Sequence, residues 1–122
     1  MEVVEDLVDQ SLLKVTDTPH GTRFRMLETV REFAAAHRER AGEDEAVTAR
    51  FFCWARDFGV AHHDAPFGAN SFASGHLIRA EQDNLVHALR LALDHADSDT
   101  VAAVTACWAA CAPPRPVPTT PG

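Results

Sequence analysis

The stretch Thr22–Ala41 changes its hydrophobic period partway along, and this change restricts what the chain can fold into. Phe24 and Met26 alternate with Arg23 and Arg25, as in a strand with one apolar and one polar face. The positions that follow have helical spacing instead, and they are Leu27, Val30, Phe33, Ala34 and His37. The pattern predicts a strand that runs directly into a helix, and we expect Phe33 to lie in the core.

The residues before this stretch predict a helix and the first strand of a hairpin. One helical face of residues 3–13 is apolar and consists of Val4, Leu7, Val8 and Leu12. Leu13 and Val15 then occupy alternate positions, which is strand spacing. Residues 17–21 include a proline and a glycine and predict the turn of the hairpin. The order is therefore helix, hairpin, helix.

The second half of the chain predicts helices. Gly42 is expected to end the central helix. A bulky stripe at spacings of four, three and four residues then predicts a helix that packs against its neighbours, and it consists of Val47, Phe51, Trp54 and Phe58. Residues 63–74 predict a loop. Apolar spacing from Gly75 predicts one long helix that ends at about His95.

A last helix is predicted over Thr100–Cys111, with Ser98 or Asp99 as its cap. Its many small residues would allow neighbouring helices to approach closely. Residues 113–122 contain five prolines, so we expect an extended or disordered tail.

Composition places the chain among folded proteins and disfavours several functions. A chain of 122 residues that is 46% hydrophobic can form a modest core. The net charge of −7 is spread along the chain and offers no basic face for nucleic acid or anionic membranes. No segment is apolar enough to cross a bilayer, and the acidic N-terminus is unlike a signal peptide. We expect a cytoplasmic protein whose three cysteines are reduced and mostly buried.

Three segments resemble, in the same order and at similar spacing, one family of large bacterial transcriptional regulators. The segments are LVDQSLLKV, TRFRMLETVREFA and AEQDNLVHALRLAL, which begin at Leu7, Thr22 and Ala80. The family has a central signalling ATPase of the NB-ARC/STAND type and includes LuxR-type and SARP-type regulators. In it, a nucleotide-binding domain is followed by a winged helix and then by tetratricopeptide-like helical repeats.

The resemblance implies a mainly α fold with two parts and a tail. Residues 1–42 would be a partial winged helix, made of a helix, a β-hairpin and a helix. Residues 43–112 would begin the repeat domain with antiparallel helical hairpins, and residues 113–122 would be the tail. We therefore expect an internal or truncated piece of such a regulator, with apolar surface exposed on its N-terminal half. The implied partners are an upstream nucleotide-binding domain that holds ATP or ADP, further helical repeats, and a protein or small-molecule signal.

The resemblance also suggests which residues couple the domains. Met26, Leu27 and Glu28 stand where related proteins have a Met-His-Asp motif whose histidine senses the phosphate of bound ADP. Leu27 has no hydrogen-bonding group, so this side chain cannot sense a phosphate in that way. Glu28 could tether the start of the helix to a neighbouring domain, or it could simply complement the helix dipole. The residues expected to couple the domains are Arg23, Arg25, Glu28 and Arg31.

The sequence predicts no catalytic, cofactor or metal site in this chain, and we expect it not to be an enzyme. It has no phosphate-loop motif of the G-x-x-x-x-G-K-[ST] type. His62, His63 and Asp64 diverge on a helix, and Cys107 and Cys111 would need two further ligands to hold a metal.

The alternative function is that of a small winged-helix DNA-binding protein with a helical extension. It is disfavoured because the helix that would enter the major groove is acidic, with Glu2, Glu5, Asp6 and Asp9. Arg23 and Arg25 of the hairpin could contact DNA or pair with acidic groups. An independent enzyme is a third and weaker hypothesis.

Overall fold

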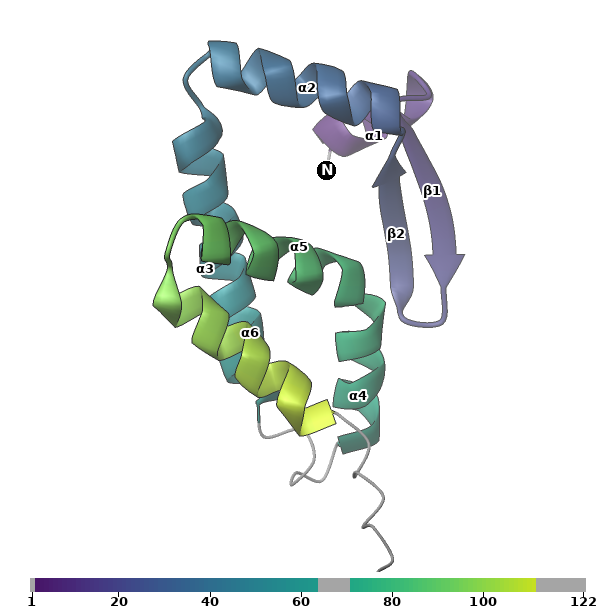
Figure 1. Ribbon diagram of the computed structural model, residues 1–122. Coiled ribbons are helices and arrows are strands. Elements are labelled where there is room, and N and C mark those ends of the chain that lie inside the picture. The colour runs from purple at the N-terminus through teal and green to yellow at the C-terminus, as the bar shows by residue number, and fades with distance from the viewer. Residues whose placement is uncertain (1, 64–70, 112–122) are drawn as a thin grey trace, which may run out of the picture. The chain divides into compact units, whose positions relative to one another are not determined.

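The computed structural model describes residues 2–63 and 71–111, in which the chain forms six helices and one β-hairpin (Figure 1). The helices are α1 (Glu2–Asp9), α2 (Glu28–Arg40), α3 (Asp44–His62), α4 (Ser71–Ala80), α5 (Gln82–Asp94) and α6 (Ser98–Cys111). The strands are β1 (Leu13–Thr18) and β2 (Gly21–Met26). The mainly α fold predicted from the sequence is therefore confirmed for the described residues.

The chain divides into two units, Met1–Thr48 and Ala49–Gly122, which we call the N-terminal and C-terminal units. The finer division into a partial winged helix at 1–42 and a repeat domain at 43–112 stays a prediction. The predicted tail at 113–122 lies outside the described residues. Within the described residues, no helix combines the length and the apolar character that a membrane span requires.

In the N-terminal unit, α1 packs against β1, and its end is set by a left-handed residue. Ser11 has a φ of 60°, and the N–H of Leu12 donates to the carbonyl of Leu7 at 2.9 Å. The helix therefore ends before residue 13, the limit that the spacing predicted. Its predicted apolar face is half-buried and consists of Val4, Leu7, Val8 and Leu12.

The hairpin has only Pro19 and His20 between its strands, because Thr18 pairs with Gly21. Gly21 has a φ of 119°, which a residue with a side chain rarely adopts. The strands therefore extend into residues that the sequence predicted as turn.

Helix α2 ends at a glycine. Gly42 has a φ of 73°, and the N–H of Glu43 donates to the carbonyl of Arg38 at 3.1 Å. This Schellman-type geometry confirms Gly42 as the end of the helix.

The core of the C-terminal unit is formed by side chains from four helices. Its buried members are Ala55, Ile78, Leu85, Ala88, Val104 and Cys107. Three residues of the predicted stripe pack against it, namely Phe51, Trp54 and Phe58. Their rings follow one another along α3, with centroids 5.7 Å and 5.6 Å apart. The prediction that this stripe packs against neighbouring helices is confirmed for these three.

The long helix predicted from Gly75 to His95 is wrong, because the chain turns at Glu81 between α4 and α5 (Figure 1). Both α4 and α5 pack against α6, and the hydrophobic spacing of one segment does not encode that arrangement. The predicted loop is also too long, since α4 already begins at Ser71. Residues 64–70 of that loop lie outside the described residues.

The connection from α5 to α6 is short and fully specified by hydrogen bonds. Ala96 has a φ of 54°, and the N–H of Asp97 donates to the carbonyl of Ala92 at 2.8 Å. Oδ1 of Asp97 then accepts from the N–H of Thr100 at 3.2 Å. Asp97 therefore caps α6, and the predicted cap at Ser98 or Asp99 is wrong. The capping residue Asp97 directly follows Ala96, the residue in the left-handed conformation.

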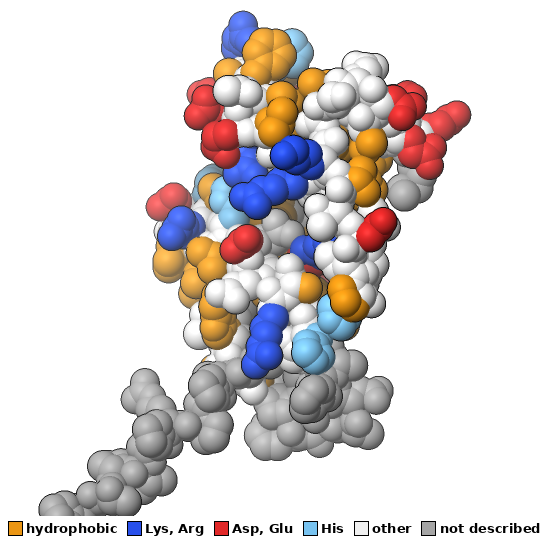
Figure 2. All heavy atoms as spheres, turned by 90° about the vertical axis from the view of Figure 1, so that its right-hand side faces the viewer, with side chains coloured by type: hydrophobic (Ala, Val, Ile, Leu, Met, Phe, Trp, Pro, Cys, Tyr) orange, Lys and Arg blue, Asp and Glu red, His pale blue; other side chains and the backbone are white. Residues whose placement is uncertain are grey.

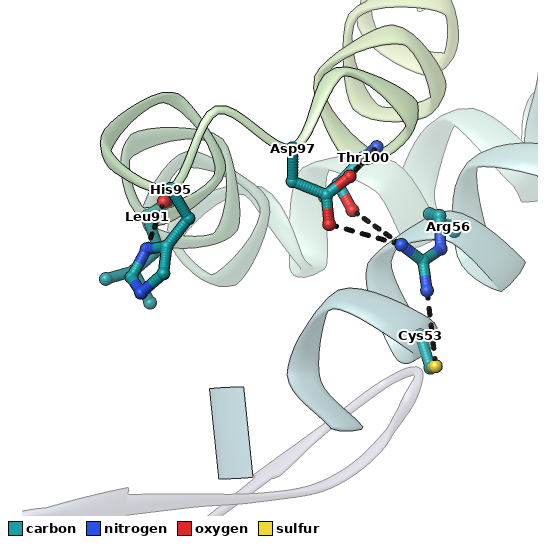
Figure 3. Close-up of polar contacts among 6 residues, drawn as sticks. All are labelled: Cys53, Arg56, Leu91, His95, Asp97 and Thr100. Atoms are coloured by element: carbon teal, nitrogen blue, oxygen red, sulfur yellow. Dashed lines mark hydrogen bonds and ion pairs between the residues drawn. The ribbon is translucent and has the colours of Figure 1, made fainter. Parts of the chain in front are cut away.

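Asp97 also connects α6 to α3 through Arg56 (Figure 3). Nη1 of Arg56 lies 3.2 Å from Oδ2 of Asp97 and donates to Oγ1 of the buried Thr100 at 3.4 Å. Nη2 of Arg56 donates to Sγ of Cys53 at 3.4 Å. Cys53 is exposed and Cys107 is buried, so the expectation of buried thiols holds for Cys107 and is wrong for Cys53.

Gly59 allows α3 and α6 to approach each other closely. A Cβ atom at this position would lie 2.5 Å from the carbonyl oxygen of Ala103 and 2.8 Å from its carbonyl carbon. Real Cβ atoms do not come so close to backbone atoms, and backbone cannot rotate away as a side chain can. The small residues predicted to permit close approach in the last helix include Ala103.

We predict that Gly59→Ala lowers the free energy of unfolding by about 1–3 kcal/mol, because the added methyl group would force α3 and α6 apart. Gly75→Ala is the matched control. A Cβ at Gly75 meets nothing within 4 Å, and alanine is the better helix former by about 1 kcal/mol. Thermal unfolding followed by circular dichroism should show a lower midpoint for the first variant and a higher one for the second. Equal midpoints would contradict the close approach.

Candidate functional site

The hairpin has one apolar face and one basic face, and its register decides which residues share them. Leu13 lies opposite Met26, and Val15 lies opposite Phe24. On the other face Lys14 lies opposite Arg25, and Thr16 lies opposite Arg23. Because side chains alternate across a strand, these pairs place the cations together on one face. Figure 2 turns the hairpin side of Figure 1 toward the viewer and shows adjacent Lys and Arg side chains there.

A groove of about 430 Å³ lies where the hairpin passes into α2. It is lined by Lys14, Thr16, Arg25, Met26, Leu27 and Glu28. It thus brings together four residues that the sequence analysis singled out, from Arg25 to Glu28. Lys14 and Thr16 were missed as site residues. Their signal was the alternation of β1, but it points to this groove only once the register of the hairpin is known.

The four predicted coupling residues differ in how they are placed. Glu28 and Arg31 pair with each other, with Oε2 and Nη1 3.6 Å apart. Both side chains are well exposed, so the pair contributes less than about 1 kcal/mol to stability. Arg25 is exposed at the groove, whereas Arg23 is half-buried and lies two pairs further along the hairpin.

The N-terminus of α2 lies at the groove and has no capping side chain. Leu27 is the N-cap residue, with the extended backbone (φ −63°, ψ 144°) that such residues adopt. Glu28 contributes an acidic group to the first turn, which complements the helix dipole. The first N–H groups of the helix therefore lack the side-chain oxygen that usually accepts from one of them.

The N-terminal unit buries none of its described residues, and several large apolar side chains are exposed. Phe33 is 69% exposed, so the expectation that it lies in the core is wrong. Its ring stacks on His37, with centroids 6.3 Å apart, but most of its surface stays accessible to solvent. The prediction that the N-terminal half exposes an apolar surface is therefore confirmed for the described residues. Its other main members are Val3, Val15, Phe24 and Leu27.

The other side chains considered for chemistry were histidines, cysteines and one aspartate. No group of three or more His, Cys, Asp or Glu side chains within the described residues could hold a metal ion. The imidazole of His62 stacks on Phe58, with centroids 4.3 Å apart, and Nδ1 of His63 lies 2.7 Å from the carbonyl oxygen of Val60. Asp64 and the side chain of Cys111 lie outside the described residues.

Comparison with known proteins found no match to a family model, a curated protein or a solved structure. The groove therefore has to be interpreted from its own chemistry. It offers two cations, a hydroxyl group, apolar surface, the helix N-terminus and the carboxylate of Glu28, which pairs with Arg31, and none of its six lining residues is a histidine or a cysteine. These groups suit the binding of an acidic group better than the activation of a nucleophile.

We predict that Leu27→Asp stabilises α2, because an aspartate in this backbone conformation can accept a hydrogen bond from the first turn. The expected gain over Leu27→Ala is about 1 kcal/mol. Leu27→Ser should give a similar effect without the added charge. Chemical denaturation of the three variants would measure the difference, and equal stability of all three would contradict the described start of the helix.

Proposed function

We propose that the chain is a non-catalytic regulatory and interaction segment of a bacterial transcriptional regulator with an NB-ARC/STAND-type signalling ATPase. In this proposal, the N-terminal unit belongs to a partial winged helix that contacts a nucleotide-binding domain. The C-terminal unit begins a tetratricopeptide-like repeat arm that receives a signal. ATP or ADP would be held by the nucleotide-binding domain and not by this chain.

The observation that carries the proposal is the uncovered apolar surface of the N-terminal unit. Phe33 is 69% exposed, and Val15, Phe24 and Leu27 are each more than 40% exposed. A two-stranded hairpin is marginal alone and normally requires cover on one face. Exposed apolar side chains gathered in one small unit are typical of surfaces that contact a protein. This supports a neighbouring domain as the natural cover.

The join between β2 and α2 supports the coupling role. Met26, Leu27 and Glu28 line the groove. By the resemblance, they correspond to the Met-His-Asp motif of related STAND proteins, in which the histidine senses nucleotide. The groove includes the junction of β2 with α2, because β2 ends at Met26 and α2 begins at Glu28. A ligand or domain that contacts the groove would therefore contact the first residue of α2. We infer that these residues transmit a change of nucleotide state and do not catalyse one.

The C-terminal unit supports the repeat arm through its helical packing. Helices α5 and α6 are joined by residues 95–97 and pack against each other, as in a helical hairpin. Alanine, glycine and a few large residues fill the spaces between the helices, which suits stacked repeats.

The alternative function, a winged-helix DNA-binding protein, has one observation in its favour. Lys14 and Arg25 lie together on the hairpin, and a hairpin of this kind could contact phosphates. Against it, α1 has acidic residues in its first turn, and its described charged side chains are all acidic. DNA binding by this surface would place those carboxylates near phosphates, which repels the duplex.

We predict that the chain slows ADP release from the isolated nucleotide-binding domain of such a regulator from the same organism. Phe33→Asp should abolish this effect while leaving the thermal midpoint of the chain unchanged, because Phe33 is exposed here and would be buried only in the complex. Leu93→Asp is the matched control, since Leu93 is 62% exposed on the other unit. A labelled nucleotide would report the release rate.

Two results would count against the proposal. Equal release rates with and without the chain would remove the coupling role. Binding of random-sequence duplex DNA at low salt, with affinity falling steeply as salt rises, would favour the alternative function, since that dependence reports neutralisation of phosphates. We expect no shift of the duplex in a gel mobility assay.

A further inference from the structure

The pairing of Lys14 with Arg25 is unfavourable within the hairpin. The two residues lie directly opposite each other on neighbouring strands, where Cβ atoms are about 5 Å apart. Like charges at such positions repel and reduce the stability of the pair of strands. Both residues are exposed, and neither side chain takes part in a hydrogen bond or ion pair with the described residues. The fold itself gains nothing from two cations here.

The surrounding charge makes this pair more unusual. The chain has a net charge of −7, with 18 Asp and Glu against 11 Lys and Arg, so acidic partners for the two cations are plentiful. The carboxylate of Glu28 lines the same groove, but Arg31 pairs with it. The groove therefore keeps an uncompensated positive charge on a chain that is acidic elsewhere.

Apart from the two cations and Glu28, the groove is lined by two apolar side chains and one hydroxyl group. Leu27 is 43% exposed at its wall, and Met26 lines it from the end of β2. Thr16 adds a hydroxyl group from β1. A ligand that fills this groove would need one or more anionic groups for the cations and an apolar group for Leu27. Free phosphate satisfies the first requirement and leaves the second unmet.

We propose that this groove binds an acidic segment of a protein partner in which carboxylates flank a leucine-like side chain. The inference rests on the proposed function, because it specifies the chemistry of the surface that the coupling segment contacts. The carboxylates lie against Lys14 and Arg25 and relieve their mutual repulsion. The apolar side chain covers Leu27. Charge complementarity then favours this partner over a neutral or basic one.

A protein segment fits the groove better than duplex DNA does. DNA-binding surfaces extend cations over several phosphates, whereas this groove has two cations and ends at Glu28. The exposed Leu27 would lie against phosphates without a matching apolar group on the backbone.

The experiment measures binding of a fluorescein-labelled peptide to the full chain by fluorescence anisotropy. The probe is an extended peptide with alternating Asp or Glu and Leu, flanked by glycine and serine. Its neutral counterpart has Asn and Gln in place of the acids. The chain is compared with the double variant Lys14→Gln/Arg25→Gln, and with Arg90→Gln as a matched control on α5.

We expect the double variant to bind the acidic peptide about tenfold or more weakly, while Arg90→Gln binds as the unchanged chain does. The thermal midpoint of the double variant should stay the same or rise, because the repulsion between residues 14 and 25 is removed. Loss of binding with unchanged or higher stability is a combination that a merely structural role for these cations would not give.

Three outcomes would overturn the inference. They are equal affinity of the double variant for the acidic peptide, equal affinity of the chain for the acidic and neutral peptides, and tighter binding of duplex DNA than of the acidic peptide. None of them depends on the ADP-release measurement, which uses Phe33 and a separate domain. Peptide binding can therefore fail while the proposed function stands, and the proposed function can fail while the groove binds the peptide.

Discussion

The absence of a side chain at Gly59 is the constraint on which the C-terminal unit depends. Helix α3 can lie against the backbone of α6 only because no Cβ has to fit between Gly59 and the carbonyl group of Ala103. That approach brings Arg56 within reach of Asp97, and Asp97 in turn caps α6. The aromatic side chains Phe51, Trp54 and Phe58 of α3 pack against the buried core. The close approach at Gly59, the ion pair and part of the core therefore all involve the same pair of helices, α3 and α6.

The N-terminal unit is organised on the opposite principle. Its two strands pair with each other, and backbone hydrogen bonds close the ends of α1 and α2. None of its described side chains is buried. Large apolar side chains that a folded unit normally buries, such as Phe33 and Phe24, are exposed in this unit. An element with so little of its own burial is well suited to take its stability from what it contacts. A contact surface of that kind is the basis for the proposed coupling role.

Local rules predicted much of the fold, and long-range packing determined what they missed. The change of period at Met26 located the join of strand and helix, and the glycine at position 42 located the end of α2, because both depend on neighbouring residues alone. The break at Glu81 and the exposure of Phe33 could not be predicted in this way, since each depends on which helices pack nearby. The groove shows both cases. Arg25, Met26, Leu27 and Glu28 were singled out by the family resemblance, whereas Lys14 joins them only through the register of the hairpin.

The connection between α5 and α6 has a consequence for how such a chain can change in length during evolution. Ala96 closes one helix in a left-handed conformation and the next residue, Asp97, begins to cap the following one, so every residue of the link has a fixed backbone role. An inserted residue would remove either the closing hydrogen bond or the cap, and it would also draw Asp97 away from Arg56. Insertions are tolerated where the backbone makes few hydrogen bonds. This link should therefore keep a constant length among descendants of the chain, even where the residues around it diverge.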